Sequence, residues 1–141
     1  MDSVPKVFLG GTINESTWRQ RLIAQLKVPY FDPVVPEWNY AAQVNEDRQK
    51  AICRYHLYVV TPLMMGVYSI AELTNDAIKY PVRTYVCFLK SDDGQTFDDA
   101  QWKSLLQVAK LVQLSGAKFF TSLESVAVNL NATLSIKNSI K

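Results

Sequence analysis

Glu72 lies in the part of the sequence best suited to carry out chemistry. An apolar run from Leu57 stops at Thr61-Pro62, crosses a loop that contains Gly66, and enters a helical pattern with Glu72 in its first turn. In an open α/β sheet, ligands bind beyond the carboxyl ends of the strands. A carboxylate at such a position can act as a nucleophile, so Glu72 is the leading catalytic candidate.

The four residues Ser69-Ile70-Ala71-Glu72 also fit a structural role. Ser69 and Glu72 have capping-box spacing, in which each side chain bonds the backbone N–H of the other residue at a helix start. From these four residues alone the cap is favoured. Tyr68 and Ser69 are nevertheless candidate substrate ligands. Met65 could line a pocket for a base, or equally belong to a core or a subunit contact.

A second candidate segment is the loop Gly10-Gly11-Thr12, which follows the first apolar run. Adjacent glycines let the backbone approach a ligand, and free N–H groups there and at the next helix start would suit a phosphate or a sugar oxygen. Arg19 could add charge, although arginines on helices are usually solvated. The loop is neither G-x-G-x-x-G nor a Walker sequence, and an ordinary tight turn is the alternative.

The third candidate segment runs from Asp32 to Tyr40. Trp38 and Asn39 suit stacking on a planar base and hydrogen bonding to its edge, and Asp32 could relieve charge on a leaving base. Two structural alternatives remain open. Trp38 and Tyr40 could fold under the loop, and Asp32 could simply accept hydrogen bonds within a turn.

His56 is the single histidine and a further candidate for contact with a substrate. It could titrate near neutral pH, although a lone histidine at a strand start is more often a satisfied structural group. Cys53 and His56 form a C-x-x-H pattern without a second ligand pair, which favours packing over a metal site. We therefore expect no metal and no cofactor. Cys53 and Cys87 lie in apolar segments, as reduced core thiols do.

Apolar runs alternate with helical patterns along the chain, as in βαβ units around a parallel sheet. The expected strands are Lys6–Gly10, Val28–Phe31, Leu57–Thr61, Val82–Leu89 and Lys118–Phe120. The expected helices are Ser16–Leu26, Asn45–Tyr55, Ser69–Lys79, Asp99–Leu114 and Ser122–Leu134. We predict one α/β domain over residues 1–141, doubly wound, with a five-stranded mainly parallel sheet and helices on both faces. The three candidate loops then meet at one edge of the sheet.

Several other polar residues are expected to be structural. Asn14 or Ser16 would cap the helix that carries Trp18, and Asp98 or Asp99 would cap the helix that follows them. Two acidic residues, Glu46 and Asp47, are expected to complement the start of their helix, and Asn75 and Asp76 to be solvated. The polar residues after Leu134 are expected to fray.

The composition argues against several classes of partner. The chain has 141 residues, 48% hydrophobic content and a net charge of +2. No Lys/Arg block interleaves with aromatic residues, which disfavours a nucleic acid polymer. No apolar run approaches the roughly 20 residues of a transmembrane helix, and the first residues do not read as a signal peptide. We expect a cytoplasmic protein that acts on a small molecule.

Three segments together resemble the nucleoside 2-deoxyribosyltransferases and the related deoxynucleotide N-glycosidases. They are KVFLGGTIN with WRQRLI, YFDPVVPEWN, and LYVVTPLMMGVYSIAEL, and the resemblance fades after Leu89. It implies that Glu72 is a nucleophile that forms a covalent glycosyl intermediate on nucleosides or their monophosphates. The sugar would then pass to another base or to water. The resemblance also implies a homo-oligomer and no cofactor.

Two departures from the family pattern keep other functions open. Members of this family often carry a tyrosine on the first strand that orients the nucleophile, where this chain has Phe8. Their loop before the glutamate commonly contains an acid, whereas Leu63 to Tyr68 contains none. The alternatives are a non-catalytic nucleotide-binding module and, with less support, a hydrolase of nicotinamide nucleotides.

Overall fold

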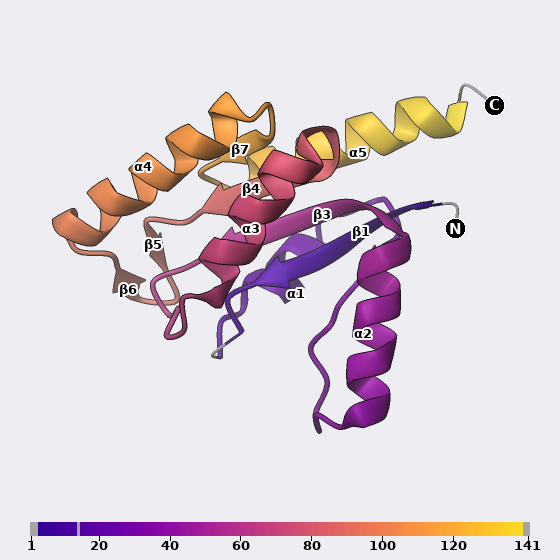
Figure 1. Ribbon diagram of the computed structural model, residues 1–141, viewed down its shortest axis with the longest axis horizontal. Helices are drawn as coiled ribbons and strands as arrows, with labels where there is room; N and C mark the ends of the chain where they lie inside the picture. The colour runs from indigo at the N-terminus through magenta and orange to yellow at the C-terminus, as the bar shows by residue number, and fades with distance from the viewer. Residues whose placement is uncertain (1–2, 14, 140–141) are drawn as a thin grey trace.

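A parallel sheet forms the centre of the protein in a computed structural model, which describes residues 3–13 and 15–139 (Figure 1). Its strands follow the order β2-β1-β3-β4-β7, and every adjacent pair is parallel. The strands are β1 (Val4–Gly11), β2 (Tyr30–Phe31), β3 (Cys53–Val60), β4 (Thr84–Phe88) and β7 (Lys118–Phe120). The predicted doubly wound α/β fold is confirmed.

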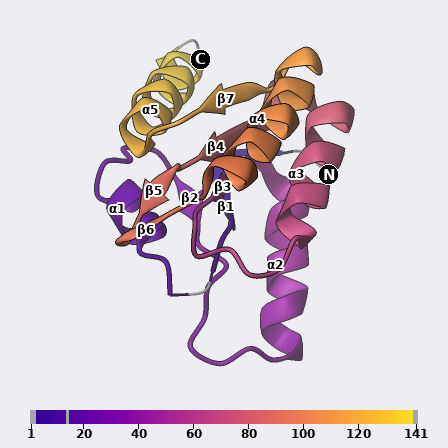
Figure 2. The same ribbon diagram turned by 90° about the vertical axis from the view of Figure 1, so that its left-hand side faces the viewer.

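Helices cover both faces of this sheet. They are α1 (Trp18–Ile23), α2 (Tyr40–Ile52), α3 (Tyr68–Lys79), α4 (Asp99–Leu114) and α5 (Leu123–Ser139). Figure 2 shows α1 and α5 on one side, with α2, α3 and α4 on the other. Alternate residues of a strand point to opposite faces, so Leu57 and Val59 join the core under α1 and α5, whereas Tyr58 and Val60 join the core under α3 and α4.

Helix α2 differs from the others because none of its residues is buried. It extends away from the sheet, and only a few contacts join it to β1 and β3 (Figure 1). Asn39 explains where it begins, since the Asn39 side chain accepts a hydrogen bond from the Ala42 backbone N–H at 2.8 Å. The helix therefore starts at Tyr40, five residues before the predicted Asn45.

Other boundaries also differ from the prediction. Strand β3 begins at Cys53 instead of Leu57, and α5 continues to Ser139 instead of fraying after Leu134. The segment between the fourth predicted strand and the next predicted helix forms a hairpin of β5 (Ser91–Asp92) and β6 (Gln95–Thr96). A 3-10 turn, η1 (Pro81–Arg83), replaces the first two residues of the predicted fourth strand, and Pro81 occupies its first position, where the fixed φ of proline suits a helical turn.

Two predictions about helix starts can be compared with the structure. Asp98 caps α4 in a complete capping box with Gln101, as predicted in part. Asn14 lies outside the described residues. The residue before α1 is Thr17 and makes no side-chain cap, so the expected cap by Ser16 is wrong, although the Ser16 hydroxyl accepts a hydrogen bond from the Trp18 N–H at 3.4 Å. Among the described residues, no helix combines the length and the apolar character needed to cross a bilayer.

The order of strands reverses between β1 and β3, which is where open sheets bind ligands. Gly11 lies at this point with φ of +118°, and a Cβ there would lie 2.0 Å from the Val59 carbonyl oxygen. A side chain on Gly11 is therefore excluded by the backbone of the neighbouring strand. This close pairing fixes the edge of the sheet from which the candidate site is built.

Candidate active site

A cavity of about 670 Å³ lies beside β1 and β3 on the side of the sheet that carries α2 and α3. Six of the residues predicted for the site line it: Gly10, Gly11, Trp38, Tyr68, Ser69 and Glu72. Five others do not line it: Thr12, Asp32, Asn39, His56 and Met65. Residues that the sequence did not indicate as ligands complete the wall, chiefly Gln43, Glu46, Asp47, Lys50 and Tyr58.

A second hollow, of about 750 Å³, lies between α3 and α4. Its wall is mostly apolar, with Ile70, Ile78 and Val108 among its residues, and none of the lining side chains is ionisable. The hollow between α3 and α4 therefore offers no carboxylate, unlike the cavity that contains Glu72.

Glu72 forms an ion pair with Lys50 in the wall of the cavity. Helix α3 begins at Tyr68, so Glu72 lies in its second turn and not in the first. The residue before the helix makes no side-chain cap, and the predicted capping box between Ser69 and Glu72 does not form. The Glu72 carboxylate instead accepts a hydrogen bond from Lys50 Nζ through Oε2. A carboxylate held this way is available for chemistry in the cavity.

Asp76 is buried, which contradicts the expectation of a solvated position. Its Oδ2 accepts a hydrogen bond from the Tyr58 hydroxyl and lies 3.1 Å from His56 Nδ1. Burial raises the pKa of Asp76, but the hydrogen bonds from His56 and Tyr58 outweigh burial and leave this pKa below its ordinary value. Burial and the bond to Asp76 raise the pKa of Tyr58, so its hydroxyl stays protonated.

His56 is held by two partners behind the cavity. Its Nε2 donates to the Lys50 carbonyl oxygen at 2.7 Å, and its Nδ1 faces Asp76. Its ring lies 6.0 Å from that of Phe8. This arrangement matches the structural alternative for His56. In the described part of the chain, no three His, Cys, Asp or Glu side chains gather as they would around a metal ion.

Arg19 is buried, so the expectation of a solvated arginine is wrong. Its guanidinium donates to three carbonyl oxygens of the glycine loop: Leu9 at 3.1 Å, Thr12 at 2.7 Å and Gly11 at 3.4 Å. Burial lowers the pKa of Arg19 to about 10, against the opposing effect of Asp32. The side chain remains charged at neutral pH and holds the loop in shape.

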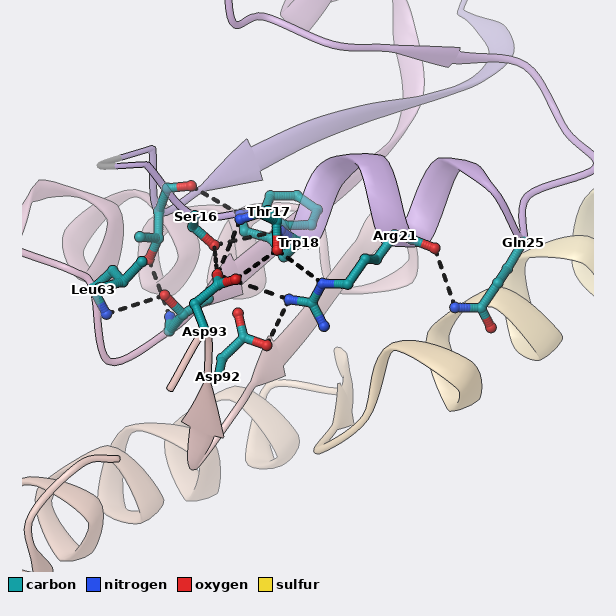
Figure 3. A network of polar contacts seen from close by, with 10 residues as sticks. Ser16, Thr17, Trp18, Arg21, Gln25, Leu63, Asp92 and Asp93 are labelled. Atoms are coloured by element: carbon teal, nitrogen blue, oxygen red, sulfur yellow. Dashed lines mark hydrogen bonds and ion pairs between the residues drawn. The ribbon is translucent and has the colours of Figure 1, made fainter. Parts of the chain in front are cut away.

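The backbone amides predicted to be free at this loop are engaged. The Thr12 N–H donates to the Val59 carbonyl at 2.9 Å, while the Thr12 hydroxyl oxygen accepts from the Thr61 N–H at 3.0 Å. At the start of α1, the Thr17 N–H donates to Asp93 at 3.0 Å, as Figure 3 shows. A carboxylate of the protein thus occupies the position that was predicted for a phosphate.

Of the residues in the loop after β2, Trp38 alone among the three candidates faces the cavity. Trp38 is 56% exposed, which contradicts the alternative that it folds under the loop. Asn39 caps α2 instead. Asp32 accepts from the Val34 N–H at 3.0 Å and lies 3.7 Å from Arg19 Nε, as a turn acceptor would.

Helix α2 contributes a polar stripe that the sequence analysis missed. Gln43 and Lys50 each lie three and four residues from the adjacent pair Glu46 and Asp47, and all four residues line the cavity. Glu46 and Asp47 lie in the middle of α2, so the expectation that they complement its start is wrong. Burial, Asp47 and Glu72 together raise the pKa of Glu46. The helical spacing was a visible signal, hidden by the late predicted start of the helix.

A comparison with protein families agrees with this geometry. The family described as "nucleoside 2-deoxyribosyltransferase like" matches residues 4–76, which is more than half of the 141 residues. The match spans the glycine loop, the polar stripe of α2, and α3 as far as Asp76. No curated protein and no solved structure gave a significant match. The chain therefore belongs to the nucleoside 2-deoxyribosyltransferase-like family.

Proposed function

We propose that the protein cleaves the N-glycosidic bond of nucleosides and transfers the sugar to another base or to water. The observation that carries this proposal is the Glu72 carboxylate, which is held by Lys50 in the wall of a cavity that also contains Trp38. A carboxylate and an exposed aromatic ring are what a sugar C1′ and a planar base require. Membership of the family supports the same reaction class.

The reaction would proceed in two displacements. A Glu72 oxygen forms a bond to C1′ while the C1′–N bond breaks, and the electron pair of that bond leaves with the base, which takes up a proton. A second base or a water molecule then attacks C1′, loses a proton, and returns the electron pair of the ester bond to Glu72. Because each step inverts C1′, the product retains the configuration of the substrate.

Glu46 is the better-supported proton donor for the leaving base. It lines the cavity, and burial together with Asp47 and Glu72 raises its pKa toward the range in which a carboxyl can donate. Asp32 lies outside the cavity wall and already accepts a backbone hydrogen bond. We therefore assign to Glu46 the role that the sequence analysis gave to Asp32.

The charges of the cavity favour nucleosides without a 5′-phosphate. Glu46, Asp47 and Glu72 bring three carboxylates to the wall. Among the described residues, the two cations of the wall are already engaged, Arg19 by backbone carbonyls and Lys50 by Glu72. A phosphate dianion would meet repulsion without a free cation to offset it.

The test is to measure free base by chromatography after the protein is incubated with deoxynucleosides or deoxynucleoside monophosphates, with and without an acceptor base. We expect base release that falls by roughly 10³-fold or more in Glu72→Gln. Glu124→Gln is the matched control, because Glu124 is exposed at the start of α5, which lies across the sheet from the cavity. Undiminished release by Glu72→Gln would contradict the proposal.

A binding module without catalysis is the second candidate, and Phe8 favours it. Phe8 lines the cavity where the resembling enzymes carry a tyrosine hydroxyl. Such a module would bind a nucleoside in calorimetry with no release of base, and Glu72→Gln would leave that binding unchanged.

A further inference from the structure

Lys50 is attached to α3 through both its side chain and its backbone. The ammonium group binds Glu72, and the carbonyl oxygen accepts from His56, whose other ring nitrogen faces Asp76. Glu72 and Asp76 are four residues apart and therefore share one face of α3. A closed ring of contacts thus joins α2, β3 and α3 around Lys50.

The backbone attachment satisfies a requirement of α2. This helix ends at Ile52, so the Lys50 carbonyl is one of the last four, which have no partner within the helix. His56, on β3, supplies the missing donor at 2.7 Å. The last turn of α2 is consequently fixed against the sheet, although the rest of the helix has no buried residue.

The Lys50 ammonium group has a second contact, with the ring of Tyr58. Lys50 Nζ lies 5.8 Å from the centre of the Tyr58 ring, within the range of a cation–π contact. The Tyr58 hydroxyl is held by Asp76, so the ring cannot move without loss of that bond. The positive charge therefore has a defined place in the cavity.

Glu72 needs such a fixed charge. Glu46 and Asp47 bring two more carboxylates to the same wall, and the presence of Glu72 contributes to the raised pKa of Glu46. Without a cation these groups would repel one another. Lys50 contacts Oε2 of Glu72, and no hydrogen bond from the described residues reaches Oε1. The second oxygen is thus left to attack.

We propose that Lys50 is the positioning residue that orients Glu72 for attack on C1′, and that His56 and Asp76 hold Lys50 in place for this purpose. This role rests on the proposed function. In this chain the ammonium group of Lys50, on α2, would orient the nucleophile, because Phe8 on β1 has no hydroxyl group to do so.

Steady-state kinetics on a deoxynucleoside test the role. In Lys50→Met we expect kcat to fall about 100-fold, because the nucleophile loses its orientation. We expect KM to stay within about threefold, because substrate contacts remain. Lys50→Arg restores a cation and is expected to recover at least roughly a tenth of the wild-type kcat. Lys79→Met is the matched control, an exposed lysine in the last turn of α3. A kcat for Lys50→Met within about threefold of the wild type would overturn the proposal.

A second measurement separates this proposal from the proposed function. The ¹⁵N-coupled proton signal of the Lys50 ammonium, identified by its loss in Lys50→Arg, is expected in the wild type and should disappear in Glu72→Gln. A signal that is missing in the wild type, or unchanged in Glu72→Gln, would overturn the pairing. Undiminished turnover by Glu72→Gln would overturn the function of Glu72 itself. Loss of turnover in Glu72→Gln with none in Lys50→Met would overturn the role of Lys50 alone.

Discussion

Two cations, Arg19 and Lys50, line this cavity, and they bind different kinds of partner. Arg19 lies in the first turn of α1, its side chain is 6% exposed, and it binds backbone carbonyl oxygens at the end of β1. Lys50 stands at the end of α2 with a side chain that is 31% exposed, and it binds the Glu72 carboxylate. A cation bound to backbone carbonyls stabilises the loop they belong to, whereas a cation bound to the Glu72 carboxylate is, under the proposed function, placed to orient a nucleophile. We therefore distinguish two walls by the partner of their cation. The wall around Arg19 and the glycine loop shapes the cavity, and the wall around Lys50 and Glu72 carries the proposed nucleophile.

The largest effect on stability is expected at Arg19. In Arg19→Met, the Leu9 and Gly11 carbonyl oxygens lose the guanidinium donor, and the Thr12 carbonyl keeps only the Trp18 indole N–H. Asp32 also loses its ion pair, so the free energy of unfolding should fall by about 3 kcal/mol. In Lys50→Met the loss should stay below about 1 kcal/mol, because its ion pair is partly exposed. Urea denaturation followed by circular dichroism measures both values. Equal losses in the two variants would remove the distinction between the two walls.

Arg19→Lys sharpens the same comparison. A lysine keeps the charge but lacks the planar fork that reaches several carbonyls at once, so we expect about half of the stability loss of Arg19→Met. Full stability in Arg19→Lys would mean that the charge near Asp32, and not the bonds to the glycine loop, is what the fold requires.

An intermediate effect is expected at Asp76, which is buried in the fold and holds Tyr58 of the cavity wall. In Asp76→Asn the amide oxygen can still accept from Tyr58 and His56 but carries no charge, so the unfolding free energy at pH 7 should fall by about 2 kcal/mol. If Asp76 also holds Lys50 in place, kcat falls as well. A loss of stability with unchanged kcat would confine Asp76 to the fold.

The pH dependence of Asp76 gives a second check. The pKa of Asp76 is lower in the folded protein than its ordinary value of 3.8. Its contribution to stability is therefore present above about pH 4 and is lost as the pH falls through the folded pKa. In urea denaturation, wild type and Asp76→Asn should differ most near neutral pH and converge as the pH falls through the folded pKa of Asp76. A difference that stays constant through that fall in pH would show that the charge of Asp76 contributes nothing.

The sequence predicted the fold better than its edges. The predicted bounds of β7 and α4 agree with the observed ones. For α4, the apolar residues recur with helical spacing and Asp98 marks the start of the helix. The start of α2 was missed because Asn39 was interpreted only as a ligand for a base, whereas its side chain caps the helix. Because the helix starts at Tyr40, Glu46 and Asp47 lie in its middle and line the cavity, and not at its first turn as predicted.

Candidate residues could be predicted where a single segment of the sequence determines their position. Gly11 ends β1, and Glu72 lies near the start of the helix that follows β3, and both positions follow from the sequence pattern. Lys50 and Asp76 were missed because their roles depend on which helix faces lie opposite each other, and spacing along one segment does not give that. The capping box of Ser69 and Glu72 shows the converse, since a valid local motif gave way to a contact between distant segments.

The smallest effect is expected at Trp38, at the rim between the two walls. Its side chain is 56% exposed, so Trp38→Ala should change the unfolding free energy by less than about 0.5 kcal/mol. A base that stacks on the ring would lose roughly 1 kcal/mol of binding, so KM for a nucleoside should rise about fivefold with kcat nearly unchanged. Tyr40→Ala is the control, because Tyr40 is 82% exposed and does not line the cavity. If Trp38→Ala instead lowered stability and left KM unchanged, Trp38 would belong with Arg19 to the wall that shapes the cavity.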